Sequence, residues 1–362
     1  MGNQKMDKIV IYGSYGYTGD LIAKLASESG VNVLLSGRDD EKLTEQSARL
    51  GLPYRKASLD SDEEMDHLLQ TADIVIHCAG PFVRTWKQMA DACIRNRCHY
   101  LDITGEILVF EALKKMGGQF KEAGIMAMPG IGFDVVPTDC LASFLSTRMP
   151  DSVKLELAFM GLGGGVSRGT AKTMIENIGE GGLIRRNGEL KKVPAAYKTK
   201  KINFGEREAS AVSIPWGDIS TAYTSTGIPD IIVYMSAPST MIRSMKISNY
   251  IQFLLKLGFV KNRLRKKIDQ RAPGPNDTQR EQGKSYIWGR VENKEGDHLE
   301  AVIQTCEGYR LTAEMAWNIA NKVKGGQFEA GYQTPSNMYG SGLIFEHPDT
   351  KWIVEPDHEI SL

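Results

Sequence analysis

The sequence predicts an α/β fold, with a parallel sheet in its first part and a second, mixed α/β domain after it. Short apolar runs alternate with helical patterns through the first 150 residues, and glycines follow the first run at a spacing of three. The chain has 362 residues, 41% of them hydrophobic, and a formal net charge of zero, as expected for a globular protein. We expect a first domain over residues 1–150, a second over 151–310, and a segment over 311–362 that returns to the first.

The first element is a strand over residues 8–12 (KIVIY), and a helical pattern follows over residues 20–26. The glycines between them allow a sharp turn, close approach of backbone to a pyrophosphate, and tight packing of the helix on the sheet. The N–H groups at the helix start then face the phosphates. The pattern predicts a Rossmann-type dinucleotide site, and a tight connection without a ligand is the alternative. The cofactor-binding residues expected here are Gly13, Ser14, Tyr15, Gly16, Tyr17, Thr18 and Gly19.

The second strand, over residues 31–35, leads into Ser36, Gly37 and Arg38. Folds that select NAD place an acidic residue at the end of this strand to bind the ribose 2′-hydroxyl, and this chain has none there. A guanidinium at this place pairs with a 2′-phosphate, so the sequence favours NADP(H). Lys42, one helical turn later, adds a second positive charge. The alternative is an exposed arginine offset by the three acidic residues that follow it.

Further strands are expected over residues 74–78, 99–103 and 125–128, with a helix over 86–96. Ligands bind at the carboxyl ends of such parallel strands. We therefore expect the nicotinamide half of the cofactor to lie against the segment that follows the 74–78 strand, which consists of Ala79, Gly80 and Pro81.

Candidate catalytic residues stand at or near the later strand ends. We select Tyr100 and Asp134 there, together with Arg168 in the second domain. Asp102 is expected to contact the cofactor. The sequence leaves two roles open for Asp102 and Glu106, which are binding of the ribose and capping of the following helix.

The second domain is expected to be rich in strands, for example over residues 153–160 and 285–291. Ser167 is a plausible N-cap, so that Arg168 presents a cation at a helix start, where it holds a carboxylate or polarises a thioester carbonyl. A capped helix with only a packing role is the alternative. The chain after Phe345 is expected to lie along the surface.

Residues 240–271 combine apolar positions with many lysines and arginines. An amphipathic basic helix contacts either a membrane surface or an acidic acyl-carrier partner, and the alternative is a helix that covers a core.

Several classes of function are excluded by composition. The neutral charge does not indicate a nucleic-acid partner. Residues 1–7 lack an apolar export signal, and no apolar run is long enough for a transmembrane span, so we expect a cytoplasmic protein. The five cysteines lack CxxC spacing and the six histidines lack paired spacing, so we expect reduced thiols and no metal site.

The chain resembles the saccharopine dehydrogenase-like oxidoreductases, and within them the bacterial trans-acting enoyl reductases. The matching stretches run in order along nearly the whole chain: GSYGYTGDLIA, SGRDDEKL, CAGPF, YLDITGE, GFDVVPTD, SRGTAKT, IPWGD, STGIPDI, GPND, WGRVE, GYRLTAEMA and GYQTPSNMYG. The resemblance implies an NAD(P)-binding Rossmann domain, a mixed second domain and hydride transfer.

The function expected from these observations is NADPH-dependent reduction of an activated double bond, in an enoyl thioester or a related substrate. Reduction of an amino-acid imine is the alternative enzyme, for which Arg84, Arg168 and Arg185 are the available cations. A cofactor-binding sensor without turnover is the alternative of another class, because the first domain offers no Tyr-x-x-x-Lys pair. We expect a homodimer with a small-molecule or acyl-thioester substrate.

Overall fold

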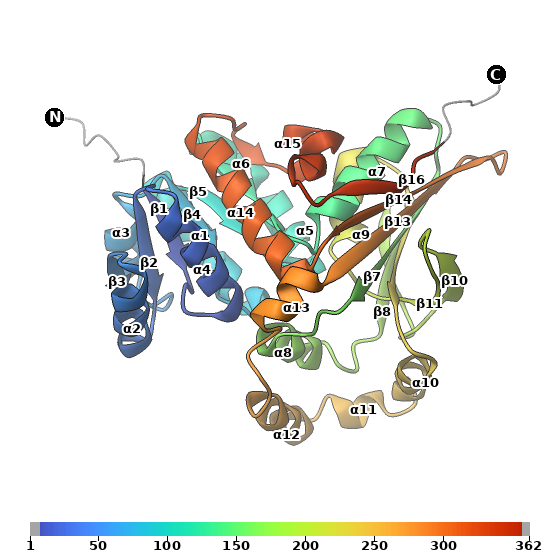
Figure 1. The fold of residues 1–362 in the computed structure, drawn as a ribbon, viewed down its shortest axis with the longest axis horizontal. Helices are drawn as coiled ribbons and strands as arrows, with labels where there is room; N and C mark the ends of the chain where they lie inside the picture. Colours follow the sequence, from blue (N-terminus) through green and yellow to red (C-terminus); the bar gives the residue numbers. More distant parts are fainter. Residues whose placement is uncertain (1–7, 357–362) are drawn as a thin grey trace. The chain divides into compact units, whose positions relative to one another are not determined.

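The computed structural model describes residues 8–356 and divides into two compact units (Figure 1). The first unit runs to Asp134 and also includes Tyr309–Met338. The second comprises Val135–Gly308 and the chain from Tyr339 onward. The prediction that residues 1–7 carry no export signal lies outside the described residues.

The first unit contains a parallel sheet, as the sequence predicts. Within the described residues it has seven strands in the order β15-β6-β5-β4-β1-β2-β3. Their bounds are β1 Ile9–Tyr12, β2 Val33–Gly37, β3 Tyr54–Lys56, β4 Ile74–His77, β5 His99–Asp102, β6 Met126–Met128 and β15 Gly331–Tyr332. The helices are α1 Tyr17–Glu28, α2 Asp40–Leu50, α3 Asp62–Leu69, α4 Phe82–Asn96, α5 Ile107–Lys115, α6 Gly117–Glu122, α14 Gly308–Lys324 and α15 Pro335–Tyr339.

The central strands form because they are apolar and buried throughout. Every residue of β1, β2 and β4 is buried, which is typical of parallel strands covered on both faces. Ile9 pairs with Val33 on one side and with Ile74 on the other, so the carboxyl ends of β1, β2 and β4 lie next to one another. This edge is where the predicted cofactor residues stand.

The second unit contains a mixed sheet. Its order within the described residues is β10-β11-β12-β7-β13-β14-β16, with β8 on β12 and β9 on β8. The strands are β7 Lys154–Leu162, β8 Gly182–Arg186, β9 Glu189–Val193, β10 Thr199–Asn203, β11 Glu208–Ser213, β12 Asp230–Ser236, β13 Lys284–Glu292, β14 His298–Cys306 and β16 Lys351–Val354. The helices are α7 Val136–Arg148, α8 Arg168–Glu176, α9 Asp218–Thr226, α10 Ser239–Ser248, α11 Gln252–Leu255, α12 Gly258–Asp269, α13 Asp277–Gln282 and the 3₁₀ helix η1 Ser341–Glu346.

Two expectations for this unit need correction. The chain after Phe345 adds β16 to the sheet beside β14, whereas the sequence led us to expect a surface tail. Residues 240–271 form three helices, α10, α11 and α12, in place of one, since the chain leaves helical geometry at Ile251 and again at Leu257.

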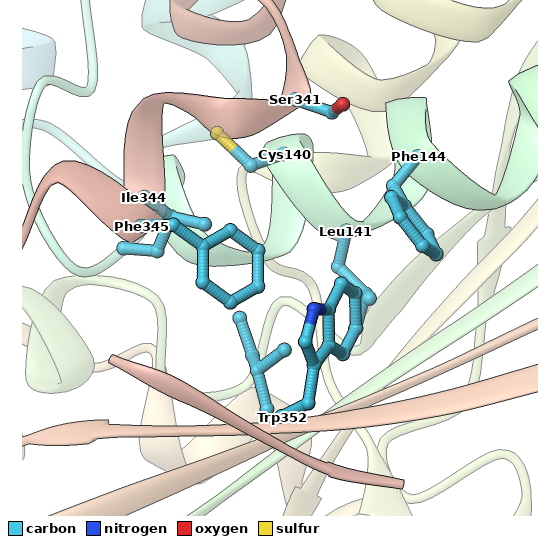
Figure 2. A pocket seen from close by; sticks show the side chains of 8 residues that line it. Cys140, Leu141, Phe144, Ser341, Ile344, Phe345 and Trp352 are labelled. Carbon is cyan, nitrogen blue, oxygen red and sulfur yellow. The ribbon is translucent and has the colours of Figure 1, made fainter. Parts of the chain in front are cut away.

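An apolar cluster holds β16 in place (Figure 2). The Trp352 ring lies 4.6 Å from that of Phe144 on α7 and 4.8 Å from that of Phe345 on η1. The small pocket between these side chains leaves no room for a water molecule. Filled apolar packing of this kind stabilises the unit and does not provide a substrate site.

All five cysteines are free thiols, and four of them are buried. Among residues 8–356, no helix is both long enough and apolar enough to cross a bilayer.

Candidate functional site

The turn between β1 and α1 requires glycine at two positions for steric reasons. Gly13 has a φ of +79°, and a Cβ there would lie 2.8 Å from the backbone nitrogen of Ala79 at the end of β4. A Cβ on Gly19 would overlap the carbonyl oxygen of Gly13. At Gly16 the added Cβ would lie 3.2 Å from the same oxygen, which is tight but less severe. The turn is therefore folded tightly against its own backbone and against the next strand.

Ser14 anchors this turn to the rest of the sheet. Its side chain is buried, and its hydroxyl donates to the side-chain oxygen of Gln46 at 2.7 Å. The Gln46 amide in turn donates to the Ser14 carbonyl at 2.9 Å and to Asp20 at 2.7 Å. The hydroxyl of Ser14 is thus engaged within the protein, and only its backbone remains to contact a ligand. Gln46, which the sequence pattern did not single out, is the residue that fixes the turn.

The N-terminus of α1 is suited to bind an anion. Its N-cap, Gly16, has no side chain, and the described residues supply no side-chain cap. The N–H groups of Thr18 and Gly19 lie in the first turn, where no preceding helical carbonyl exists to accept them. Tyr17 packs edge-on against Tyr309 of α14, with the ring centroids 5.1 Å apart. The orientation of the helix dipole and these N–H groups favour a phosphate here.

The end of β2 is closed by Tyr15. Its hydroxyl accepts the backbone N–H groups of Arg38 at 3.2 Å and Asp39 at 3.3 Å. A Cβ on Gly37 would come within 2.5 Å of the Tyr15 ring, so this position also needs glycine. Ser36 is buried, and its hydroxyl donates to the carbonyl of Arg55. Ser36 and Gly37 therefore shape this edge without offering a free side-chain donor.

Arg38 and Lys42 differ in whether an acidic side chain pairs with them. Arg38 is exposed, and the described part of the chain gives its guanidinium no ion pair. Lys42 forms an ion pair with Asp39 at 2.7 Å. Asp39 is also the N-cap of α2, and the Lys42 ammonium beside it lowers the pKa of its carboxyl. Arg38 is thus the cation that is available to a ligand at this edge, while Asp39 neutralises Lys42.

The segment after β4 is open. Gly80 is exposed, and a Cβ there would have only an ordinary contact, 3.5 Å from the Phe82 ring. The carboxylate of Glu106 accepts the N–H groups of Phe82 and Val83, both at 2.9 Å, and so caps α4. Glu106 therefore caps a helix that precedes it in the chain, and not the helix that follows it. Ala79, Gly80 and Pro81 thus form a short loop. Glu106 fixes the helix that follows the loop, and Gly80 is exposed.

Asp102 connects three parts of the first unit. Its carboxylate accepts the Tyr100 hydroxyl at 2.5 Å and the N–H groups of Thr104 and Gly130, both at 2.9 Å. Burial raises the pKa of Asp102 to about 6, and burial together with this carboxylate raises that of Tyr100 well above its usual value. Both side chains are buried. This geometry gives Tyr100 a positioning role through Asp102, and its direct part in catalysis stays a prediction.

Asp134 is the titratable group most suited to proton transfer. A Cβ on Gly105 would lie 2.7 Å from its carboxylate, so glycine allows the carboxyl to pack against the loop after β5. Within residues 8–356 this carboxyl has no hydrogen bond. The side chain is half-buried, and desolvation raises its pKa to about 7. A pKa near the working pH is the property that a general acid needs.

Arg168 belongs to the second unit, at the start of α8. Ser167 is the N-cap, accepting the N–H of Thr170 at 3.2 Å, which confirms the cap predicted from the sequence. The side-chain Nε of Arg168 is buried, and nothing in the described part of the chain accepts its hydrogen. A cation with an unsatisfied donor at a helix N-terminus favours an anionic or carbonyl ligand.

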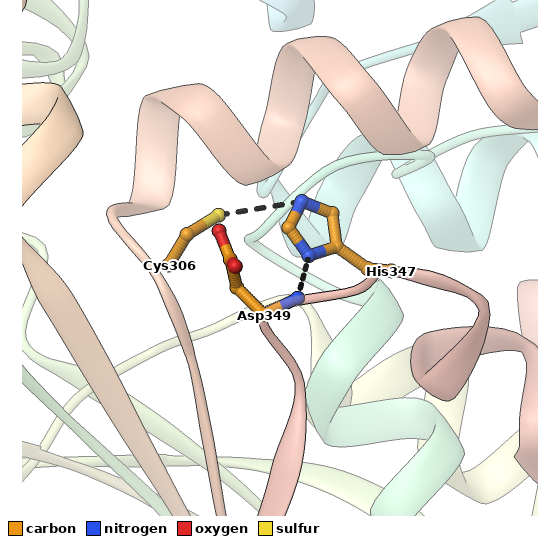
Figure 3. Close-up of side chains that lie close together, drawn as sticks. All are labelled: Cys306, His347 and Asp349. Atoms are coloured by element: carbon orange, nitrogen blue, oxygen red, sulfur yellow. Dashed lines mark hydrogen bonds between the residues drawn. The ribbon is translucent and has the colours of Figure 1, made fainter.

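A further cluster lies at the end of β14 (Figure 3). The Sγ of Cys306, a ring nitrogen of His347 and a carboxylate oxygen of Asp349 lie within 4.8 Å of one another, although Cys306 precedes His347 by 41 positions. His347 Nε2 is 3.5 Å from Sγ, and Nδ1 accepts the backbone N–H of Asp349 at 3.2 Å. The ring thus uses Nδ1 for a nearby backbone N–H and turns Nε2 toward the sulfur. These two contacts join the three residues into a hydrogen-bonded cluster.

Residues 9–128 match the model of the saccharopine dehydrogenase NADP-binding domain. This part of the chain is therefore a domain of the saccharopine dehydrogenase NADP-binding kind. The resemblance predicted from the sequence is confirmed. The glycines at 13 and 19 and the uncapped α1 agree with a domain that holds a dinucleotide.

The relatives that this chain resembles carry different names. A "Lipid droplet localized protein" of Caenorhabditis elegans is 24% identical over 67% of this chain and 63% of its own. A "Saccharopine dehydrogenase-like oxidoreductase" of Rattus norvegicus is 24% identical over 59% of this chain and 57% of its own. A "Trans-acting enoyl reductase" of Mycobacterium leprae is 30% identical over 36% of this chain and 33% of its own. The chain thus spans less than two thirds of the length of these relatives.

Two solved structures share the fold of both units. Saccharopine dehydrogenase (L-Glu forming) from Saccharomyces cerevisiae matches with a TM-score of 0.62 and 12% identity, covering 94% of this chain and 96% of its own. Homospermidine synthase from Legionella pneumophila, solved in complex with NAD, matches with a TM-score of 0.61 and 10% identity, covering 95% and 91%. The α/β fold with a second mixed sheet is therefore confirmed.

Proposed function

We propose that the protein is an NADPH-dependent oxidoreductase that reduces an activated carbon–carbon double bond, with an enoyl thioester as the substrate class. The observation that carries the proposal is the glycine turn, which folds so tightly that a Cβ at Gly13 or Gly19 would overlap backbone. Such a turn beside an uncapped helix start fits a pyrophosphate. The name of the mycobacterial relative supports the enoyl class.

The proposed cofactor contacts follow the edge of the first sheet. The first turn of α1 binds the pyrophosphate, and Arg38 pairs with the 2′-phosphate of NADPH. Ala79, Gly80 and Pro81 lie against the nicotinamide, where an exposed glycine leaves room for a planar ring. A bound nicotinamide supplies the hydride.

We assign two roles in the reaction, donation of the proton and binding of the substrate carbonyl, to two residues. When the β-carbon of the substrate accepts a hydride, negative charge develops on the thioester, and the α-carbon needs a proton. Asp134, whose pKa is raised to about 7, donates that proton. Arg168, whose Nε lacks an acceptor, binds the thioester carbonyl.

The same proposal includes the roles of the two units. Residues 1–150 bind the cofactor, and 151–310 bind the substrate and form a homodimer. Of residues 311–362, the part up to Met338 completes the first domain with β15 and most of α14, and the chain from Tyr339 onward belongs to the second unit. An acyl-carrier protein is the proposed source of the acyl thioester. The free cysteines are consistent with a reducing compartment, so we propose the cytoplasm.

The imine alternative has less support. It needs several cations for the carboxylates of an amino-acid substrate, and Arg185 was one of the candidates. Arg185 is buried, donates to the carbonyls of Ile219 and Gly188, and stacks on the Tyr223 ring. Its guanidinium therefore stabilises the second unit.

The deciding experiment has two stages. Calorimetric titration with NADPH and with NADH measures binding, and NADPH oxidation is then followed with enoyl thioesters of different chain length. Binding with turnover supports the proposal. Tight binding without oxidation of NADPH by enoyl thioesters or imines would favour a sensor, and failure to bind either nucleotide would reject the oxidoreductase.

A further inference from the structure

Helices α10, α11 and α12 carry an unusual concentration of exposed apolar side chains. Over the described residues, fourteen large hydrophobic side chains are exposed, and eight of them fall between residues 241 and 259. Three are prominent: Tyr250 is 84% exposed, Phe253 68% and Phe259 70%. The others are Met241, Ile247, Ile251, Leu254 and Leu257. We call these eight residues the apolar ridge.

Helix α12 does not hide its part of this ridge, because other side chains of α12 already pack against α8. On α12, Leu264 and Ile268 pack against Ala171 and Ile175 of α8. Phe259 precedes Ile268 by nine positions, which is half a turn away around a helix, so it points away from α8. Figure 1 shows the three helices following one another, in gold and brown. The segment therefore contains more apolar residues than α8 covers.

Positive charge accompanies the ridge. Residues 239–269 contain eight lysines and arginines and one acidic residue, Asp269. Three cations are held by the region around α8: Lys256 pairs with Glu180, Arg265 pairs with Glu176, and Lys261 donates to the Glu176 carbonyl. The other five are exposed and form no ion pair among residues 8–356: Arg243, Lys246, Arg263, Lys266 and Lys267.

Apolar and basic side chains share the same helical face. On α12, Phe259, Arg263 and Lys266 stand at positions i, i+4 and i+7, which places all three on the side opposite Ile268. On α10, Arg243 and Ile247 have the same relation. This is the pattern of a helix that lies in a lipid interface, with apolar groups directed into the acyl region and cations at the headgroups.

We propose that α10, α11 and α12 form a docking surface for an anionic lipid bilayer or monolayer. Protruding aromatic and aliphatic side chains insert into fluid lipid without matching pockets, and the Tyr250 hydroxyl suits the headgroup level. A second copy of the chain is disfavoured, because a two-fold interface would bring the unpaired cations of both copies together. The surface belongs to the second unit and the cofactor edge to the first, and the proposal does not depend on the enzyme activity.

The test is flotation of the purified full-length chain with phosphatidylcholine vesicles, with and without phosphatidylserine. We expect binding to the vesicles that contain phosphatidylserine, weakened by salt. The variant Phe253→Ser/Phe259→Ser should lower partitioning by about tenfold or more, because each phenylalanine contributes through its burial in lipid. Arg263→Glu/Lys266→Glu should remove the dependence on phosphatidylserine.

Matched variants separate this surface from general effects. Leu108→Ser removes another exposed apolar side chain, and Lys192→Glu/Lys294→Glu makes the same change of charge elsewhere, so both should bind like the wild type. Circular dichroism checks that every variant is folded. The proposal is overturned if the wild type does not float at low salt, or if Phe253→Ser/Phe259→Ser floats equally well. It is also overturned if light scattering shows that this variant converts a dimer into monomers without a loss of lipid binding.

Discussion

Replacing Arg38 tests whether this residue gives the protein the preference for NADPH over NADH that we propose. Arg38 is exposed at the carboxyl end of β2, and no ion pair within residues 8–356 holds its guanidinium. Arg38→Ala therefore breaks no internal ion pair, and its effect should fall on the ligand alone. A loss of affinity for NADPH that NADH does not share can then be assigned to the lost contact with the 2′-phosphate.

The expected magnitude follows from the environment of the side chain. A hydrogen bond to a charged group contributes about 1.5–3 kcal/mol, and exposure places Arg38 at the low end of that range. A loss of about 1.5 kcal/mol raises the Kd for NADPH about tenfold. NADH lacks the 2′-phosphate, so its Kd should change by less than about twofold.

Isothermal titration calorimetry with both cofactors measures these constants. Lys24→Ala provides the matched control, since Lys24 is an exposed cation of α1. It should leave both constants nearly unchanged, because charges far from the phosphate are screened. An equal loss of NADPH and NADH affinity in Arg38→Ala would refute the assignment of Arg38 to the 2′-phosphate.

Three further predictions concern the turn, the proton donor and the buried tyrosine. Gly19→Ala should abolish binding of either nucleotide in calorimetry, because the new Cβ overlaps the Gly13 carbonyl, while the circular dichroism spectrum stays native. Retained affinity would mean that the turn has no part in binding. Burial raises the pKa of Asp134 to about 7, so its carboxyl loses its proton above that pH, and kcat should fall about tenfold per pH unit on the alkaline side. The variant Asp134→Asn should remove this alkaline decrease in kcat. An unchanged pH profile in the variant would exclude Asp134 as the proton donor. Tyr100→Phe leaves one Asp102 oxygen without its donor, so the free energy of unfolding in urea should fall by about 1–3 kcal/mol while kcat stays nearly intact. An unchanged stability with a large loss of kcat would instead make Tyr100 catalytic.

The parts of the site that follow from local sequence could be predicted. Each glycine of the turn is limited by atoms only a few positions away or by the next parallel strand, so the spacing of Gly13, Gly16 and Gly19 carries the information. The strands β1, β4 and β5 begin where the apolar runs begin. Because such strands are buried on both faces, their apolar runs can be recognised in the sequence without knowing which strands lie beside them.

The remainder of the site depends on residues that are distant in sequence. Gln46 reaches Ser14 across 32 positions, and Glu106 reaches Phe82 across 24. Neither residue belongs to a local pattern, because its partner is set by which strands lie side by side. For the same reason β16 was missed, as its four residues form a strand only beside β14.

Residues 240–271 show a further limit of sequence patterns. An apolar position in an amphipathic helix looks the same whether it meets a core or remains exposed. Leu264 and Ile268 cover α8, but Phe253 and Phe259 have no described apolar partner in the same cluster and remain exposed. The apolar side chains that α8 does not cover are those that we propose to insert into lipid. The five cations beside them, which form no ion pair among residues 8–356, favour the anionic surface that we propose over a neutral one.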